Sequence, residues 1–377
     1  MPVPQRPRVL LLIPHLGGGG AERVTALLAQ GLSREKYELH LGLVTQTVVS
    51  PFAAEGVQIH ALGARRVRGG AVRLLRLVRS LNPDLILSGM AHLNFMVLIL
   101  RPFFPHRTRV IVRQNSTASA ALEFGGLPGY TRMLYRLLYR RADRVICQSA
   151  AMASDLVERL GIRRSQLTVL PNPIDVDAIR LRMNSGRAEP PGSVWRGAGP
   201  HLLAVGRLSR EKGFDLLLPA LAQVCGSVPA ADLVIAGSGT EEAALKGECL
   251  ALGLQRAVQF AGYVEDPSAY FAGASAFVLS SRHEGMPNAL LEAAAAGLPI
   301  VALPSSQGVT ELLRAQPGVW LAREISAAAL AESLLEALNA LRTGDRFAHD
   351  FVEQFRLERA VGAYEALIDS VLNEAQR

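Results

Sequence analysis

Residues 276–302 read AFVLSSRHEGMPNALLEAAAAGLPIVA, and their pattern indicates the class of fold. It begins with the apolar run 276–279, passes through a polar loop into a helical stretch at 287–296, and ends in a second apolar run at 300–302. Two buried strands joined by a helix are typical of a parallel sheet that helices cover on both faces. We therefore interpret the stretch as one strand-helix-strand unit of an α/β domain.

The same alternation of short apolar runs and helical stretches fills both halves of the chain. Apolar runs that we interpret as strands lie at 9–13, 39–44, 57–62, 85–87, 109–112, 144–147, 167–170, 202–205, 233–236, 258–260, 276–279 and 300–302. Helical stretches lie at 21–32, 71–81, 130–141, 214–224, 240–252, 287–296, 326–341 and 350–373. We predict an α/β chain with two doubly wound parallel sheets in Rossmann-like domains.

The length of 377 residues suits two domains of ordinary size. The alternation breaks at 182–200, a stretch rich in Gly and Pro that we interpret as a linker or surface loop. We place the domains at 1–180 and 181–345, with closing helices at 346–377 that return toward the first domain. Ligands of such sheets bind at the carboxyl ends of the strands, so two sheets facing each other across a cleft suggest two substrates.

The composition excludes several classes of protein. Hydrophobic residues make up 49% and charged residues 19%, as in a globular protein, and an aromatic content of 6% argues against binding through stacked bases. The three cysteines contain no CxxC pair, which excludes a disulfide framework and a cysteine zinc site. The N-terminus lacks the apolar core of a signal peptide, and no apolar run approaches the length of a membrane span, so we expect a cytoplasmic protein.

Positive charge is concentrated in the first half. Residues 1–180 hold 24 Lys and Arg against 11 Asp and Glu, a net charge of +13, and the remainder carries −6. Segment 130–141 interleaves Arg with Tyr and Leu at helical spacing, and a second cluster comprises Arg65, Arg66, Arg68, Arg73, Arg76 and Arg79. Such faces suit an anionic membrane surface. A solvated Arg-rich helix is the simpler alternative, and nucleic acid, for which the chain has no motif, is the competing partner.

Two glycine-rich turns follow predicted strands. Glycine lets the backbone approach a ligand, and the helix that starts after Gly17–Gly20 favours an anion. The GxGxxG spacing nevertheless fails, because the first turn would need glycine at Glu22 or Arg23 and the turn at 237–239 would need it at Glu242. Neither turn is a P-loop, so the two turns argue against a nicotinamide enzyme and a P-loop NTPase. A permissive strand-to-helix turn is the simpler explanation of each.

A basic loop lies between the strand 202–205 and the next helix, in the sequence GRLSREKG. Arg207 offers a forked donor for phosphate oxygens, and Lys212, one of only three lysines, offers a compact charge. Five residues apart across a turn, the pair has the chemistry to clamp a diphosphate. A solvated basic loop is the alternative.

Two carboxylates mark the loop and helix after the strand 276–279. Glu284 lies in the loop SRHEGMPN, where Gly285 and Pro287 shape a backbone whose N–H groups can face an anion. Glu292 lies on the following helix among apolar residues, so its carboxylate is either paired or awaits hydroxyl donors such as those of a ribose.

Together these motifs resemble the family 4 retaining glycosyltransferases of the GT-B fold. The resemblance rests on Arg207 with Lys212, on Glu284-x7-Glu292, on the turn GGGGAER at 17–23 and on LPNPID at 170–175, and it covers nearly the whole chain. It implies two Rossmann-like domains that face each other across a cleft. The domain 1–180 would bind the acceptor and the domain 181–345 the nucleotide sugar.

The resemblance also implies roles for individual residues. Arg207 and Lys212 would hold the donor diphosphate, Glu284 would face the donor sugar, and Glu292 would accept hydrogen bonds from the ribose. The remaining implied contacts to the nucleotide sugar come from glycine turns and backbone segments, at Gly18, Gly19, Gly237, Gly239, Val264, Gly285, Met286, Pro287 and Asn288.

One departure from the family concerns the acceptor side. Many relatives carry a histidine at the end of the strand that corresponds to 109–112, whereas this chain has Arg113, Gln114 and Asn115 there. We take Arg113 and Asn115 as acceptor-side residues and His92, after the preceding strand, as the candidate that replaces the histidine in catalysis. A structural histidine is the simpler alternative for His92.

We expect a retaining, metal-independent hexosyltransferase without a cofactor, because Arg207 and Lys212 can neutralise the diphosphate and no carboxylate pair suits a hydrolase. The resemblance of Met286-Pro287-Asn288 favours a UDP-sugar carrying a hexose or N-acetylhexosamine. The acceptor would be a lipid-linked glycan in bacterial polysaccharide, lipopolysaccharide or glycolipid synthesis, reached from the inner face of the cell membrane. Alternatives are a GDP-mannose-dependent mannosyltransferase, a nucleotide-sugar epimerase or phosphorylase, and a binding module without catalysis.

Overall fold

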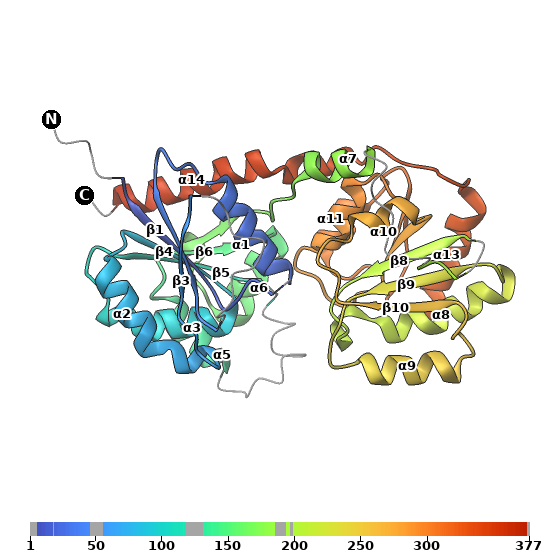
Figure 1. Cartoon of the computed structure of the whole chain (residues 1–377), viewed down its shortest axis with the longest axis horizontal. Coiled ribbons are helices and arrows are strands. Elements are labelled where there is room, and N and C mark those ends of the chain that lie inside the picture. Colours follow the sequence, from blue (N-terminus) through green and yellow to red (C-terminus); the bar gives the residue numbers. More distant parts are fainter. Residues whose placement is uncertain are drawn as a thin grey trace. The chain divides into compact units, whose positions relative to one another are not determined.

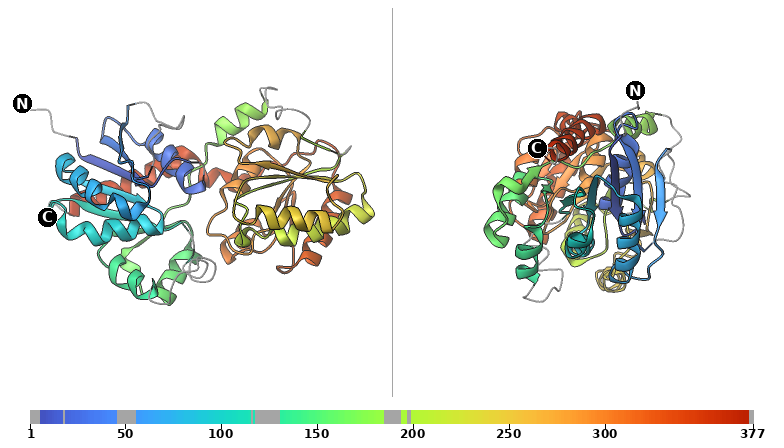
Figure 2. Two further views of the ribbon diagram at one scale, coloured as in Figure 1. Left: turned by 60° about the horizontal axis from the view of Figure 1, so that its bottom comes forward. Right: turned by 90° about the vertical axis from the view of Figure 1, so that its left-hand side faces the viewer.

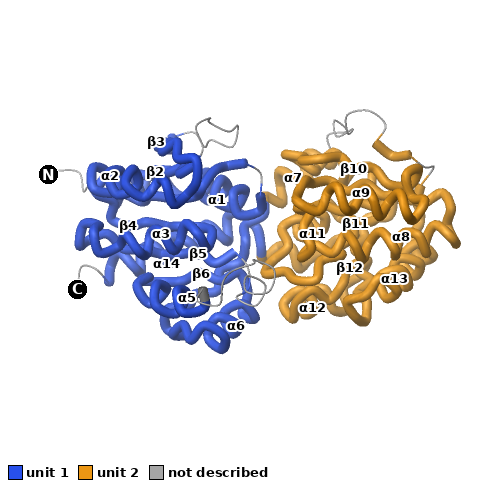
Figure 3. The backbone as a smooth tube through the Cα atoms, turned by 90° about the horizontal axis from the view of Figure 1, so that it is seen from below, with its two compact units in different colours: residues 1–174, 355–377 blue, residues 175–354 orange. Residues whose placement is uncertain are grey.

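The chain divides into two compact units. The computed structural model describes residues 6–17, 19–45, 56–115, 117, 131–184, 194–196 and 199–374. The first unit comprises Met1–Ile174 and Phe355–Arg377, and the second comprises Asp175–Gln354 (Figure 3).

A seven-stranded parallel sheet forms the centre of the first unit (Figure 1). Its strands are β1 (Arg8–Ile13), β2 (Glu38–Leu43), β3 (Gln58–Ala61), β4 (Leu85–Gly89), β5 (Arg109–Arg113), β6 (Arg144–Cys147) and β7 (Leu167–Val169). They are arranged in the order β3-β2-β1-β4-β5-β6-β7. The order reverses direction between β1 and β4, which makes the carboxyl ends of these two strands the point where such sheets bind ligands.

Helices cover both faces of this sheet. They are α1 (Gly20–Gly31), α2 (Ala71–Leu81), α3 (Ala91–Leu100), α5 (Thr131–Tyr139), α6 (Ala150–Leu160) and α14 (Leu357–Glu374). Successive residues of a strand point to opposite faces. Leu10 and Leu12 of β1 therefore join the core under α2, α3, α5 and α6, while Val9 and Leu11 join the core under α1 and α14 (Figure 1).

The second unit repeats the design with a six-stranded parallel sheet of order β10-β9-β8-β11-β12-β13. Its strands are β8 (His201–Val205), β9 (Asp232–Ala236), β10 (Val258–Gly262), β11 (Ala276–Leu279), β12 (Ile300–Ala302) and β13 (Val319–Leu321). Its helices are α7 (Val176–Asn184), α8 (Phe214–Ser227), α9 (Glu242–Ala251), α10 (Ser268–Gly273), α11 (Asn288–Ala295), α12 (Gln307–Leu313) and α13 (Ala327–Ala340). Helices α8, α9 and α13 enclose one core, and α10 and α11 cover the opposite face (Figures 1 and 2). The direction of strand order reverses between β8 and β11.

The predicted α/β class with two doubly wound parallel sheets is confirmed. The helix predicted at 71–81 has those bounds, and the helix predicted at 350–373 is a short 3₁₀ helix, η5 (Asp350–Phe355), followed by α14. Strand β13 was not predicted, because its three residues lie at the edge of the sheet and are only half-buried. No helix among the described residues combines the length and apolarity that a bilayer span requires.

The compact units differ by a few residues from the predicted divisions at 180/181 and 345/346. Helix α7 packs against α10 and α11 and so belongs to the second unit from its first residue. At the end of the first unit's long segment, the amide of Ile174 donates to the carbonyl of Phe355 at 2.8 Å, where the chain re-enters that unit. Helix α14 then contributes Tyr364 and Ile368 to the core beneath α1.

Candidate active site

The loop after β8 packs directly against the loop after β11. Gly213 has a φ of +66°, and a Cβ atom there would lie 2.0 Å from the carbonyl oxygen of Ser280. The Ser280 hydroxyl donates to the carbonyl of Lys212 at 2.9 Å. Only glycine allows this approach, so Gly213 is required for the two strand-end loops to meet at the reversal of the sheet.

A bidentate ion pair also joins the loop after β11 to the first turn of α8. The two terminal nitrogens of Arg282 donate to the two carboxylate oxygens of Asp215 at 2.6 and 2.7 Å, and this bonding raises the pKa of Arg282. The same guanidinium donates to the carbonyl of Arg210 at 3.0 Å, and the Arg282 amide donates to the carbonyl of Glu211 at 2.8 Å. Bidentate arginine–carboxylate pairs fix geometry as well as charge. The loop after β11 is therefore held to the loop after β8 at several points.

Lys212 and Glu284, which were predicted as separate contacts to the donor, form an ion pair. The Lys212 Nζ lies 2.7 Å from Glu284 Oε1, and the Ser281 hydroxyl donates to the same oxygen at 2.6 Å. Glu284 is 8% exposed, and the Lys212 side chain is 25% exposed. A buried carboxylate needs such partners to offset its lost hydration. One cation and one anion of the site thus hold each other in place.

Arg207 and Glu292 occupy different surroundings at the same edge of the sheet. Arg207 is exposed, and its guanidinium has no hydrogen bond or ion pair with a described residue, so the group is available to an anion from solution. Glu292 lies on α11 and is buried together with its neighbours Leu291 and Ala293. The loop residues Gly285 and Met286 are half-buried, and Pro287 precedes the first turn of α11.

Gly237 and Gly239 have a structural explanation. A Cβ atom at Gly237 would lie 1.8 Å from the carbonyl oxygen of Gly206, and one at Gly239 would lie 2.2 Å from that of Leu208. These glycines let the loop after β9 pack against the loop after β8. Their predicted contact with the nucleotide stays a prediction, as does that of Val264, whose side chain is half-buried.

The glycine-rich turn after β1 lies beside a buried carboxylate. The amide of Gly17 donates to His15 Nδ1 at 3.0 Å, and the same nitrogen lies 3.7 Å from a carboxylate oxygen of Glu22. A Cβ atom at Gly19 would lie 2.3 Å from the Glu22 carboxylate, so this side chain occupies the space that glycine leaves. Gly18 lies outside the described residues.

His92 is the second residue of α3, the helix that follows β4, and it is exposed. Partial loss of hydration lowers the pKa of His92, and His15 lowers it further, while Glu22 opposes the change. His92 follows β4, the neighbour of β1 at the reversal of the first sheet.

Arg113 is engaged inside the first unit. It is buried, and its guanidinium donates to the Tyr364 hydroxyl at 3.1 Å and to the side-chain oxygens of Asn115 and Asn172. The arginine thereby joins the end of β5 to the LPNPID segment and to α14. The Arg113 guanidinium thereby holds the Asn115 side chain, and Asn115, which is half-buried, is the more exposed member of the pair.

Sequence reasoning missed the Arg282–Asp215 pair and the link from Arg113 to Tyr364. The sequence holds only a weak signal for the Arg282–Asp215 pair: both residues lie close to Lys212 or Glu284 in the sequence, but neither belongs to a motif. Among the residues that the structure describes, no group of three or more His, Cys, Asp or Glu is placed to hold a metal ion. Asp175 and Asp177 have Asp-x-Asp spacing, but Asp175 accepts the Ala178 amide at the start of α7.

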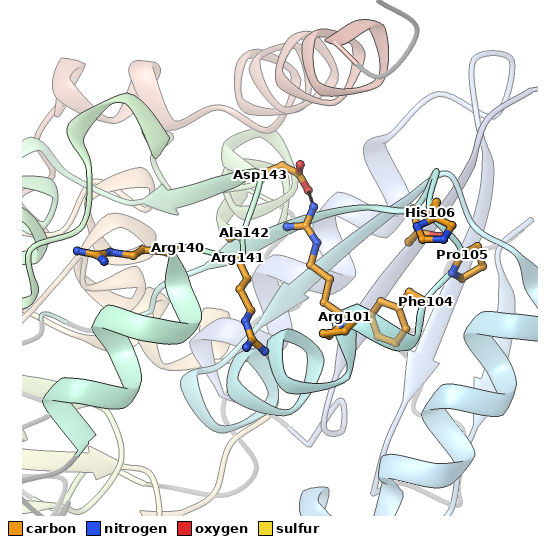
Figure 4. Close-up of a pocket in the computed structure, with 10 residues that line it drawn as sticks. Arg101, Phe104, Pro105, His106, Arg140, Arg141, Ala142 and Asp143 are labelled. Atoms are coloured by element: carbon orange, nitrogen blue, oxygen red, sulfur yellow. Dashed lines mark hydrogen bonds and ion pairs between the residues drawn. The ribbon is translucent and has the colours of Figure 1, made fainter.

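A pocket of 590 Å³ lies at the opposite edge of the first sheet, at the amino ends of β5 and β6. Arg101 donates to Asp143 at 2.6 Å on its floor, and Arg141 extends beside them, whereas the Arg140 side chain points away (Figure 4). Ligands of doubly wound sheets bind at the carboxyl ends. The pocket is therefore separate from the residues described above.

Comparison with known proteins identifies the class of protein. Residues 18–178 match the family model described as Glycosyltransferase Family 4, and residues 188–354 match the model described as Glycosyl transferases group 1. The two-sheet architecture is that of GT-B glycosyltransferases. A crystal structure of Anabaena Alr3699/HepE with UDP and glucose matches with a TM-score of 0.79 at 17% identity, covering 96% of this chain and 99% of that one. Sucrose-phosphate synthase from Thermosynechococcus elongatus matches with a TM-score of 0.80 at 18% identity, covering 98% and 100%.

The chain belongs to glycosyltransferase family 4. It is 29% identical over 320 residues to the N-acetylgalactosamine-N,N'-diacetylbacillosaminyl-diphospho-undecaprenol 4-alpha-N-acetylgalactosaminyltransferase of Campylobacter jejuni, covering 80% of this chain and 82% of that protein. It is 27% identical to the lipopolysaccharide core biosynthesis glycosyltransferase LpsE of Rhizobium meliloti, covering 94% and 98%. The protein is a glycosyltransferase.

Proposed function

We propose that the chain transfers a hexose or N-acetylhexosamine from a UDP-sugar to a lipid-linked glycan, with retention of the anomeric configuration. The observation that carries the proposal is the Lys212–Glu284 ion pair, together with Arg207 of the same loop, whose guanidinium has no hydrogen-bond or ion-pair partner among the described residues. This arrangement supplies two cations for the diphosphate of a nucleotide sugar and one carboxylate for its sugar. The family membership supplies the reaction class, and the MPN sequence after Glu284 supports UDP as the nucleotide.

In this mechanism the protein stabilises charge rather than forming a bond to the sugar. The bond between the anomeric carbon and the diphosphate oxygen breaks, while Arg207 and Lys212 offset the negative charge that develops on the leaving group. Glu284 stabilises the positive charge on the sugar, and Glu292 holds the ribose. The acceptor hydroxyl forms the new bond on the same face of the sugar and gives its proton to the departing diphosphate. We expect no metal or cofactor to be required.

The acceptor side is proposed to lie on the first unit, with Asn115 and His92 near the acceptor hydroxyl and Arg113 holding Asn115. The Campylobacter relative is named for transfer to a diphospho-undecaprenol-linked sugar, and LpsE is named for lipopolysaccharide core synthesis. We therefore propose a lipid-linked acceptor in bacterial surface polysaccharide or lipopolysaccharide synthesis. The enzyme would work at the inner face of the cell membrane.

The test is a product assay with UDP-glucose, UDP-N-acetylglucosamine, UDP-N-acetylgalactosamine and GDP-mannose, each with a polyprenyl-diphosphate-linked N-acetylhexosamine in detergent. We expect UDP release with one of the UDP-sugars, unchanged by EDTA, and an α-linked product by proton NMR. A β-linked product from these α-linked donors would refute retention. Turnover of GDP-mannose alone would refute the UDP assignment, and loss of turnover in EDTA, restored by Mg²⁺, would refute metal independence.

A further inference from the structure

Two neighbouring helices of the first unit leave large apolar side chains in solvent. Ile99 and Phe103, on α3 and the 3₁₀ turn that follows it, are 51% and 56% exposed, and Met133 and Leu137, on α5, are 58% and 53% exposed. Met133 and Leu137 are spaced i,i+4 on α5, so they lie on one side of that helix, and Ile99 and Phe103 lie on two consecutive helical segments. Among the described residues of the first unit, these four belong to a set of only six large hydrophobic side chains with such exposure.

The two helices are packed together. Phe95 of α3 meets Tyr135 of α5 edge to face, with ring centroids 4.7 Å apart. Tyr135 and Leu138 turn inward to the core, so the exposed residues of α5 lie on its outer side. Helix α3 also contacts α2, which makes the three helices one layer over this face of the sheet (Figure 1).

This layer is strongly basic. Segments 71–81, 91–103 and 131–142 contain eight Arg and no Asp or Glu. Among the described residues, Arg101 is the only one of the eight with a carboxylate within ion-pair distance, at 2.6 Å from Asp143. The positive charge of the layer is therefore almost unneutralised.

Several of these arginines bind backbone carbonyls, which fixes the side chain without cancelling its charge. Arg132 donates to the carbonyl of Arg159 at 2.7 Å, Arg73 donates to that of Leu62 at 2.6 Å, and Arg79 donates to that of Phe103 at 3.2 Å. The last contact ties α2 to the turn that carries Phe103.

We propose that the outer face of α3 and α5, here called the docking face and comprising Ile99, Phe103, Met133, Leu137 and the arginines of the layer, binds an anionic lipid bilayer. The apolar side chains enter the boundary between headgroups and acyl chains, and the arginines contact lipid phosphates. The proposal rests on the proposed lipid-linked acceptor for its purpose and names the surface and the partner. The pocket between Arg101 and Arg141 opens at one end of the same layer (Figure 4).

Charge complementarity decides between a bilayer and other occupants. A second copy of this chain, packed on the same face about a two-fold axis, would bring two unneutralised arginine layers together. Nucleic acid would satisfy the charge but would not require exposed apolar side chains. A bilayer of anionic lipid satisfies both the charge and the apolar surface.

The test is cosedimentation of the full chain with vesicles of phosphatidylglycerol and phosphatidylcholine at low salt. Leu250 of α9, in the second unit, is 63% exposed and provides a matched control. We expect the wild type to bind anionic vesicles and M133S/L137S to bind about tenfold more weakly, because two apolar side chains no longer leave water. L250S should bind like the wild type.

A second readout does not depend on the stability of the double variant. In the L137W variant, the fluorescence emission of the introduced tryptophan should shift to shorter wavelength when anionic vesicles are added. The emission of the tryptophan introduced in L250W should not shift. Absence of wild-type binding, equal binding by M133S/L137S, or an equal loss in L250S would overturn the proposal. So would vesicle-independent binding of RNA, or a dimer that the serine variants dissociate without any change in vesicle binding. Calorimetry of UDP binding on the same samples separates this result from the proposed transfer, since the donor residues lie in the other unit.

Discussion

Removal of Lys212 should expose how far the ion pair with Glu284 stabilises the second unit. The K212M variant leaves a carboxylate that is 8% exposed with the Ser281 hydroxyl as its remaining partner. Breaking a buried ion pair on one side costs about 3–5 kcal/mol. Because the Lys212 side chain is 25% exposed, part of its charge is already screened by water, and we expect a loss of about 2–3 kcal/mol.

The assay is urea denaturation followed by tryptophan fluorescence. Both tryptophans, Trp195 and Trp320, lie in the second unit, so the signal reports on the unit that holds the ion pair. R207A is the matched control: Arg207 is exposed, and its loss should change the free energy of unfolding by less than about 0.5 kcal/mol.

A double-mutant cycle completes this prediction. In K212M/E284Q no charged carboxylate remains without its cation, so the double variant should be more stable than the sum of the two single changes predicts, by about 1–2 kcal/mol. Additive effects within 0.5 kcal/mol would refute the coupling of Lys212 and Glu284. A K212M variant as stable as R207A would refute it too.

Three further predictions follow from the site and its surroundings. The D215N variant should lose the bidentate bond from Arg282 and should lower kcat/KM about tenfold or more in steady-state assays. We assign neither side chain to contact with the donor, so the effect would come from the position of the loop after β11. Unchanged kinetics would contradict this positioning role. E292Q should raise KM for the donor while E284Q lowers kcat, and equal effects on both constants would remove the distinction between ribose and sugar contacts. Burial lowers the pKa of His349, so below pH ~6.5 the unfolded chain binds more protons than the folded chain. The free energy of unfolding, measured by tryptophan fluorescence, should therefore fall as the pH is lowered below that value. The fall should be smaller in H349N.

The sequence predicts the strand-end loops well, because each lies between an apolar run and a helical stretch. It places Arg207, Lys212 and Glu284 in loops at the carboxyl ends of strands, where the structure has them. The pairing of Lys212 with Glu284 could not be predicted from spacing, since 72 residues separate them. It depends on β8 and β11 being neighbours in the sheet, an order that local patterns do not encode.

Other features depend on tertiary contacts in the same way. From the sequence, the glycines at 237 and 239 suggest a ligand-binding turn. The structure explains both by the close approach of the carbonyls of Gly206 and Leu208. Arg113 follows a strand like a binding residue, but Tyr364 reaches it from α14, more than 250 positions later in the chain. A sequence pattern shows that such a helix is amphipathic without showing which sheet it covers.

Calorimetric titration of UDP into the wild type, R207A and R210A tests whether Arg207 binds the donor diphosphate. Both arginines are exposed in the same loop, but only Arg207 is assigned to the donor diphosphate. The wild type and R210A should bind UDP with equal affinity, and R207A should bind about 10–100-fold more weakly, the effect of one lost charge-assisted hydrogen bond. Equal UDP affinity in R207A and the wild type, or no binding by the wild type, would contradict the account.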